Sequence, residues 1–156
     1  MVVAALSSSP DAFSIVLLST LGKGQSISAT DRGWLPQAEV FSQYTPDWWS
    51  GSSAETSSVV HTASDDEPPG TVLTQADFSG GALSLDSSDQ LLIYQGAESN
   101  PTFLCAFDWS GYDWKTTDSS VSSSYSGSSY SGLPRGLTSG VDALNTKTLG
   151  WSYRYY

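Results

Sequence analysis

The sequence predicts an all-β protein, an antiparallel β-sandwich of about eight or nine strands with long Trp-rich and Ser/Tyr-rich loops. Short runs of β-branched and aromatic residues alternate with clusters of Ser, Asp, Gly and Pro. No segment has the spacing of apolar residues that marks an amphipathic helix. Because 156 residues are the length of one ordinary domain, residues 1–156 are expected to share a single fold.

The first strands are predicted at residues 2–6 and 13–18, joined by turn-forming Ser, Pro and Asp residues. A Gly-Lys-Gly turn then leads into residues 25–30, where apolar and polar side chains alternate as they do in a half-buried strand. These three segments are expected to form a meander.

The remaining strands are predicted from similar runs between turn signals. They lie at residues 59–62, 71–74, 82–85, 90–94, 103–109 and 141–144. An acidic, proline-containing turn separates the first two of them. The total suits two packed sheets.

Two segments lack strand periodicity and are predicted to be long loops, residues 35–57 and 116–132. The second contains two Ser-Tyr-Ser-Gly units, and it is either a linker or an ordered arm that makes contacts through its tyrosines. The C-terminal residues 151–156 alternate aromatic and polar side chains, which indicates an edge strand or a tail that joins its own sheet or that of a neighbour.

Acidic side chains outnumber basic ones by 16 to 6, which gives a formal net charge of −10. This charge repels nucleic acid, and no apolar run is long enough to insert in a membrane as a helix. A single cysteine, Cys105, excludes an intramolecular disulfide and a thiolate metal site. No cofactor and no metal are predicted.

Side chains for nucleophilic catalysis are scarce. His61, the only histidine, lies in a predicted strand and is interpreted as structural or surface-exposed. Cys105 lies in an apolar strand and is interpreted as a core residue whose thiol stays protonated. Since no catalytic motif occurs, the protein is predicted not to be an enzyme.

Carboxylates offer the remaining route to acid–base chemistry. The pairs Asp86 with Asp89 and Asp108 with Asp113 are interpreted as turn residues, because Asp bonds the local backbone in turns. An enzyme, if there were one, would have to use Asp31, Asp89 or Asp108. The acidic residues 65–67 could bind Ca²⁺ through their oxygen atoms, but they lack the spacing of a calcium loop. Calcium binding is therefore left open, and a solvated turn is favoured.

Aromatic residues make up 12% of the chain and several lie in predicted loops. Besides filling the core, exposed aromatic rings stack on sugars or anchor protein interfaces. A sugar-binding platform would consist of Tyr44, Trp48 and Trp49 in the first long loop, or of Trp109, Tyr112 and Trp114. A self-association interface would use Trp48, Trp49, Tyr125, Tyr130, Trp151, Tyr153, Tyr155 and Tyr156.

Several short motifs occur in a fixed order along the chain. They are T-D-x-G-W at residues 30–34, P-x-G-T-V at 68–72, S-x-D-Q-L-x-x-Y-Q-G at 87–96, P-T-F-L at 101–104 and L-P-x-G-L-x-x-G at 133–140. With these motifs the chain resembles a Trp-rich all-β domain that recurs in secreted and surface-attached bacterial proteins and also occurs in algae. It is more loosely similar to the shell proteins of diatom pyrenoids.

The resemblance implies a noncatalytic β-sandwich domain whose recurring residues form turns and core. In this chain those residues are Asp31, Gly33, Trp34, Asp89, Tyr94 and Gly96. The compartment stays open, because a bacterial-like protein would be extracellular or on the cell surface and an algal one would lie in the chloroplast pyrenoid.

The sequence therefore predicts a structural protein that assembles with itself into a sheet, tube, shell or filament through β-edges and aromatic contacts. The alternative is a carbohydrate-binding or adhesion module that uses loop tryptophans. The expected partners are other copies of the chain or a polysaccharide.

Overall fold

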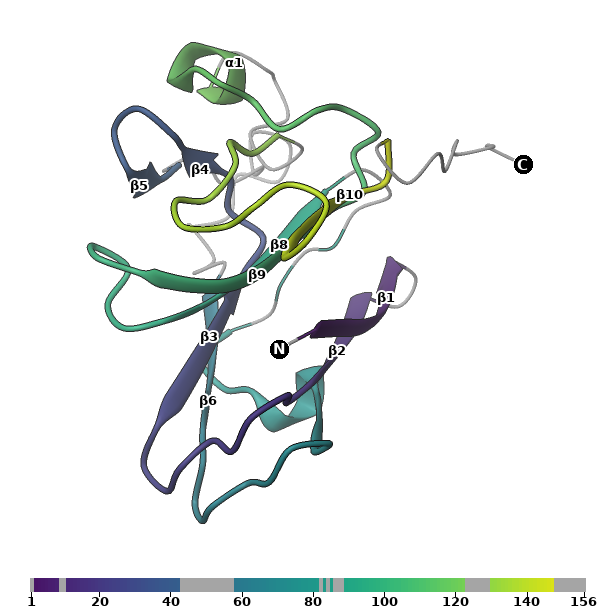
Figure 1. Ribbon diagram of the computed structural model, residues 1–156, viewed down its shortest axis with the longest axis vertical. Coiled ribbons are helices and arrows are strands. Elements are labelled where there is room, and N and C mark those ends of the chain that lie inside the picture. Colours follow the sequence, from purple (N-terminus) through teal and green to yellow (C-terminus); the bar gives the residue numbers. More distant parts are fainter. Residues whose placement is uncertain are drawn as a thin grey trace.

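The computed structural model describes residues 2–8, 11–42, 58–81, 83, 85, 89–122 and 130–147. Its regular structure is almost entirely β, which confirms that the fold is all-β as predicted (Figure 1). The strands are β1 (Val2–Ser8), β2 (Asp11–Val16), β3 (Ser26–Thr30), β4 (Trp34–Leu35), β5 (Val40–Phe41), β6 (Ser58–Thr62), β7 (Val72–Thr74), β8 (Gln90–Gln95), β9 (Thr102–Asp108) and β10 (Ala143–Asn145). The only helical pieces of the described residues are a 3₁₀ turn, η1 (Gln75–Asp77), and α1 (Asp118–Ser122).

Three sheets organise these strands. One has three strands in the order β1-β2-β7, one has five in the order β10-β9-β8-β3-β6, and the third is the short hairpin β4-β5. The described residues form ten strands in three sheets, whereas the sequence predicts eight or nine strands in two sheets. The additional sheet is the β4-β5 hairpin, whose strands have two residues each. In the view of Figure 1, β1 and β2 lie to the right of the five-stranded sheet, and β4, β5 and α1 lie above it.

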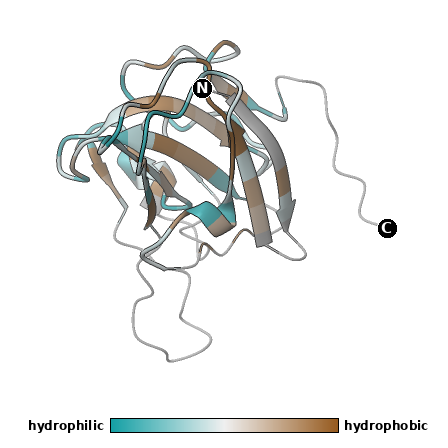
Figure 2. Cartoon of the chain, turned by 90° about the horizontal axis from the view of Figure 1, so that it is seen from below, coloured by the Kyte–Doolittle hydropathy of each residue, from teal (hydrophilic) through white to brown (hydrophobic). Residues whose placement is uncertain are grey.

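A first core joins the three-stranded and five-stranded sheets. It consists of Phe13, Ile15, Leu17, Leu21, Ile27, Ala29, Val59, Ala63, Leu73, Leu83, Leu85, Leu91, Ile93, Cys105 and Trp109. Alternate residues of β2, β3 and β7 supply it, as expected for strands with one buried face. Figure 2 shows hydrophobic colour concentrated on the strands and hydrophilic colour on the connections.

A second core lies on the opposite face of the five-stranded sheet. It consists of Trp34, Phe41, Leu92, Tyr94, Phe103, Ala106 and Ala143. Strand β8 serves both cores, because Leu91 and Ile93 face the first whereas Leu92 and Tyr94 face the second. This explains why its sequence is a continuous apolar run rather than an alternating one.

The predicted N-terminal meander is wrong in its third strand. Strands β1 and β2 pair antiparallel, but the other neighbour of β2 is β7, which enters the sheet from far along the chain. Strand β3 instead pairs with β6 and β8 in the five-stranded sheet. Its alternating pattern suits either sheet, because both line the first core, so local sequence could not choose between them.

Strand β10 corrects the expectation of a wholly antiparallel architecture. It pairs parallel with β9, with Ala143 opposite Ala106 and Asn145 opposite Asp108. The long connection between the two strands carries the chain back before it enters the sheet, and a connection of that length permits parallel pairing.

The two predicted loops are partly structured. The hairpin β4-β5 occupies the beginning of residues 35–57, and α1 lies within residues 116–132. The Asp118 carboxylate of α1 accepts hydrogen bonds from the backbone N–H groups of Gln37 (2.8 Å) and Ala38 (3.0 Å), so the helix holds the hairpin turn. In the predicted strand 82–85, Leu83 and Leu85 are buried, but neither lies in a strand.

Candidate functional site

The T-D-x-G-W motif at residues 30–34 is part of the packed fold and is not an exposed site. Trp34 is fully buried. Its N–H donates to Ser131 Oγ at 3.0 Å, and its carbonyl accepts from the Gly132 N–H at 2.8 Å. A Cβ added to Gly33 would overlap the carbonyl oxygen of Tyr130. Glycine is therefore required for residues 130–132 to pack against this motif.

The other motif residues also support the fold. Gln90 is buried, and its side-chain Nε2 donates to the Asp31 carbonyl and, at 2.9 Å, to Asp89 Oδ1. Asp31 and Asp89 are buried beside it, and Gly96 ends β8 with a φ of 86°. The structure thus brings Asp31 and Asp89, two of the three residues considered for catalysis, to one core glutamine, which bonds the backbone carbonyl of Asp31 and the carboxylate of Asp89.

Asp108, the third carboxylate, is buried at the end of β9. Its Oδ1 accepts a hydrogen bond from the Ser110 N–H at 2.7 Å, and its carbonyl accepts one from the Thr146 N–H at 2.9 Å. Desolvation raises the pKa of Asp108 to about 6, against the hydrogen bonds from Ser110 and the charge of Lys115, which lower it. Asp113 instead lies at the surface and pairs with Lys147.

The raised pKa of Asp108 predicts a pH-dependent contribution to stability. The folded carboxyl binds its proton more tightly than an unfolded one, whose pKa is near 3.8. Its contribution is fully present below that value and is lost as the pH rises through about 6. We expect the stability of the wild type, relative to Asp108→Asn, to fall by up to about 3 kcal/mol between pH 4 and pH 7. Urea unfolding of both proteins at the two pH values measures this, and a constant difference would contradict it.

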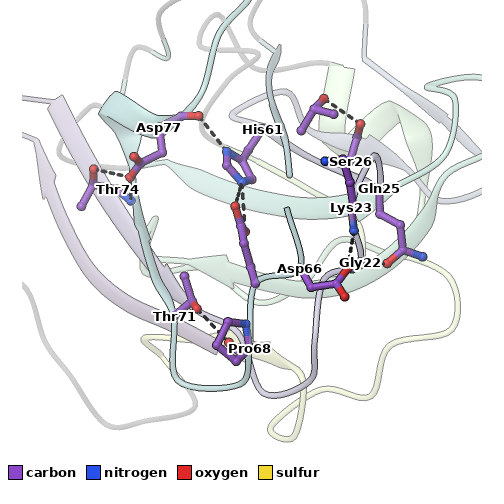
Figure 3. A network of polar contacts seen from close by, with 12 residues as sticks. Gly22, Lys23, Gln25, Ser26, His61, Asp66, Pro68, Thr71, Thr74 and Asp77 are labelled. Carbon is purple, nitrogen blue, oxygen red and sulfur yellow. Dashed lines mark hydrogen bonds and ion pairs between the residues drawn. The ribbon is translucent and has the colours of Figure 1, made fainter. Parts of the chain in front are cut away.

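His61 holds two segments onto β6, which agrees with its interpretation as a structural residue (Figure 3). Its Nδ1 donates to the carbonyl of Asp77 in η1 at 2.9 Å. Its Nε2 lies 2.9 Å from Glu67 Oε1 and 3.1 Å from Oε2. Since a carbonyl only accepts, the Nδ1 position carries a hydrogen, and the ring binds the backbone of η1 through Nδ1 and the Glu67 side chain through Nε2.

The acidic turn is built from its own partners. Asp65 Oδ1 lies 3.1 Å from the Lys23 ammonium, and Asp66 Oδ1 accepts the Lys23 N–H at 2.8 Å. Glu67 bonds His61. No group of three or more His, Cys, Asp or Glu side chains among the described residues is arranged to hold a metal ion. These contacts hold the acidic turn against Lys23 and His61.

Cys105 lies in the first core, as the sequence predicts. It is 5% exposed, and burial raises the pKa of its thiol to about 12. The thiol is therefore protonated at neutral pH and unsuited to nucleophilic attack.

Two of the tryptophans assigned to a sugar platform are not fully exposed. Trp109 belongs to the first core, stacks on Phe107 with ring centroids 5.9 Å apart and is only 5% exposed, so it offers no open ring face. Trp114 is half-buried against the second core. Tyr112, in contrast, is 48% exposed.

Tyr112 forms a surface cluster with Tyr130 and Lys115, which we call the tyrosine–lysine cluster. The two ring centroids are 4.9 Å apart. Lys115 Nζ lies 4.9 Å from the Tyr112 centroid and 4.6 Å from the Tyr130 centroid, so one ammonium is shared by two rings. A hydrogen bond with Tyr112 and partial burial raise the pKa of Tyr130. The sequence interpretation placed the two tyrosines in different candidate sites, and the structure joins them.

Lys115 differs from the other cations that the structure describes. The described residues include five lysines and arginines. The four other than Lys115 form ion pairs, namely Lys23 with Asp65, Arg32 with Glu98, Arg135 with Glu39 and Lys147 with Asp113. Within that part of the chain, Lys115 alone has no carboxylate in an ion pair and contacts tyrosine rings instead. In a chain with 16 acidic side chains, this leaves a localised positive charge on an aromatic surface.

A second surface feature is the outer edge of β1. This strand ends the three-stranded sheet, and among the described residues its only strand partner is β2. Its seven residues, VVAALSS, carry no charge. The edge of β6 is different, because Val60 exchanges two backbone hydrogen bonds with Ser79, at 2.7 and 2.8 Å. Strand β1 is thus the longest strand at a sheet edge in the described part.

The remaining candidate residues lie outside the described part of the chain. They are Tyr44, Trp48, Trp49, Asp86, Tyr125, Trp151, Tyr153, Tyr155 and Tyr156. Their assigned roles stay predictions. No described helix is both long enough and apolar enough to cross a bilayer.

Comparison with known proteins adds no relative to this description. No family model, curated protein or solved structure matches the chain.

Proposed function

We propose that this is a noncatalytic structural protein that assembles with itself through sheet edges, and that β1 is the principal edge. The open side of an edge strand presents backbone N–H and C=O groups to a strand of another molecule. Proteins that avoid such pairing place charges or prolines on their edges, and β1 has neither. This uncharged seven-residue edge is the observation that carries the proposal.

The opposite edge of the same sheet also favours self-association. Leu18 is 63% exposed and Val72 is 55% exposed, on segments joined by the hydrogen bond from Leu17 N–H to the Thr71 carbonyl (2.9 Å). Val72 lies in β7, which ends the sheet on the side away from β1, so these apolar side chains would add burial in a contact with a second copy there. The net charge of −10 opposes this association until salt screens it.

The described chemistry supports a noncatalytic role. His61 uses both ring nitrogens to hold backbone and Glu67, and Cys105 is buried with a raised pKa. Asp89 accepts from core Gln90. The residues best suited to catalysis are thus engaged in packing.

The proposal predicts assembly that grows with protein concentration and with salt. Ser7 and Ser19 are both exposed, but Ser7 lies in β1 and Ser19 in a bend outside any strand. Ser7→Lys should suppress assembly by placing a charge on the edge, whereas Ser19→Lys, which makes the same change in net charge, should not. Light scattering and negative-stain electron microscopy measure both. Equal assembly by the two variants would exclude β1, and a monomer under all conditions would exclude self-assembly.

Carbohydrate binding is a second candidate function, favoured by one observation. The tyrosine–lysine cluster presents a ring, Tyr112, that is 48% exposed and held by Tyr130 and Lys115. Aromatic rings held in place in this way suit stacking on the apolar face of a pyranose, at little cost in side-chain entropy. Binding of oligosaccharides to the wild type, followed by isothermal titration calorimetry, tests this function.

A further inference from the structure

The tyrosine–lysine cluster carries more chemical information than an aromatic platform alone. A neutral sugar needs a ring and uncharged hydrogen-bonding groups, whereas this cluster adds an ammonium group. Lys115 Nζ lies within 5 Å of both ring centroids, at 4.9 and 4.6 Å, so a ligand stacked beside Tyr112 lies within reach of the charge. The cluster therefore has one part suited to a ring and one suited to an anion.

A second observation is that Lys115 forms no ion pair among the described residues. The described lysines and arginines other than Lys115 are paired with carboxylates of this chain. Lys147 differs from Lys115 in this respect, because the Lys147 ammonium lies 2.5 Å from Asp113 Oδ2. A ligand anion would have to displace Asp113 to reach Lys147. No ion pair among the described residues would have to break for it to reach Lys115, whose charge acts on Asp108 without forming an ion pair. Its weakly held contact with two rings leaves ammonium hydrogens available for a ligand.

The loop that carries Tyr112 is fixed from two sides, so the cluster does not have to form around its ligand. The Tyr112 carbonyl accepts from Asn145 Nδ2 at the end of β10, and its N–H donates to Ser110 Oγ at 3.3 Å. On the other side, the Lys115 N–H donates to the Ser131 carbonyl at 2.9 Å, which places Lys115 beside the segment bearing Tyr130. A site held in this way loses little entropy on binding.

We propose that the tyrosine–lysine cluster binds an acidic sugar, whose pyranose ring stacks on Tyr112 and whose carboxylate pairs with Lys115. This inference rests on the carbohydrate-binding function proposed above and specifies its ligand class. The net charge of −10 weakens the approach of an anion, but charges farther than about 8 Å are largely screened at physiological ionic strength. The local positive charge of Lys115 then determines the preference.

The test compares two probes with the same sugar rings, trigalacturonate, which carries charged carboxylates, and its uncharged methyl ester, by isothermal titration calorimetry against the full chain. The wild type is expected to bind trigalacturonate roughly tenfold more tightly than the ester, the effect of one charge-assisted hydrogen bond. Lys115→Gln should remove this preference and Lys115→Arg should keep it. The control Lys147→Gln, which removes a lysine already paired with Asp113, should change the affinity by less than about twofold. Tyr112→Ala should weaken both probes, and acetate in excess should not compete.

The outcomes separate this inference from the function on which it rests. If both probes bind the wild type equally, carbohydrate binding stands and the acidic preference is wrong. If neither binds, both are wrong. If Lys115→Gln binds trigalacturonate like the wild type but no longer self-associates, the lysine contacts a second copy of the chain, and the proposal is wrong.

Discussion

Replacing Trp34 with alanine is expected to lower the free energy of unfolding by about 3–5 kcal/mol. Trp34 has 0% exposure and makes edge-to-face contacts with Phe41 and Phe103, with centroids 5.4 and 4.9 Å apart. The substitution removes the largest side chain of the second core, and the surrounding strands cannot close the cavity fully. Since domains of this size are stable by only about 5–15 kcal/mol, much of the protein would unfold at moderate urea concentrations.

Urea denaturation followed by circular dichroism measures this loss. Tyr112→Ala is the matched aromatic control, and because Tyr112 is 48% exposed we expect it to cost about 1 kcal/mol or less. Equal midpoints for Trp34→Ala and the wild type would mean that the second core does not stabilise the fold.

Replacing Gly33 with alanine is expected to lower the free energy of unfolding by about 1–3 kcal/mol. The added Cβ would overlap the Tyr130 carbonyl oxygen and lie 3.2 Å from Val121 Cγ1. Because the first obstacle is backbone, no side-chain rotation relieves it. Residues 130–132 would have to move away, which breaks the hydrogen bonds between Trp34 and residues 131 and 132.

Gly22→Ala is the control for this steric argument. Neither glycine has a positive φ, so backbone preference does not separate them. The Cβ at Gly22 would meet side-chain atoms and no backbone, with Gln25 Oε1 at 3.2 Å and Asp66 Oδ1 at 3.8 Å. We expect thermal unfolding to shift for Gly33→Ala and to stay nearly unchanged for Gly22→Ala. Similar shifts for both would contradict the close packing of Gly33 against Tyr130.

Local patterns predict most strands but not their partners. Alternation in β3 and the apolar run of β8 identify each segment as a strand, because burial on one or two faces leaves a mark on a few consecutive residues. The assignment of β3 to the five-stranded sheet depends on β6 and β8, far along the chain. Nothing within a single strand encodes that choice.

The candidate site shows the same limit. Trp109 is predicted both to end the strand 103–109 and to belong to a sugar platform, and in the structure its ring packs in the first core. A signal was present, since Cys105, Phe107 and Trp109 alternate on one face of a strand and its continuation. The tyrosine–lysine cluster had no such signal, because Tyr112 and Tyr130 are brought together by the tertiary fold.

The packing of residues 130–132 against Trp34 also affects how the chain folds. The hydrogen bond from Trp34 N–H to Ser131 Oγ spans 97 residues, and β10 completes the five-stranded sheet only near residue 145. Contacts of such long sequence separation slow folding to the millisecond-to-second range. During synthesis, the second core therefore stays open until residues 130–145 have left the ribosome, and tryptophan fluorescence should report its closure as a late event.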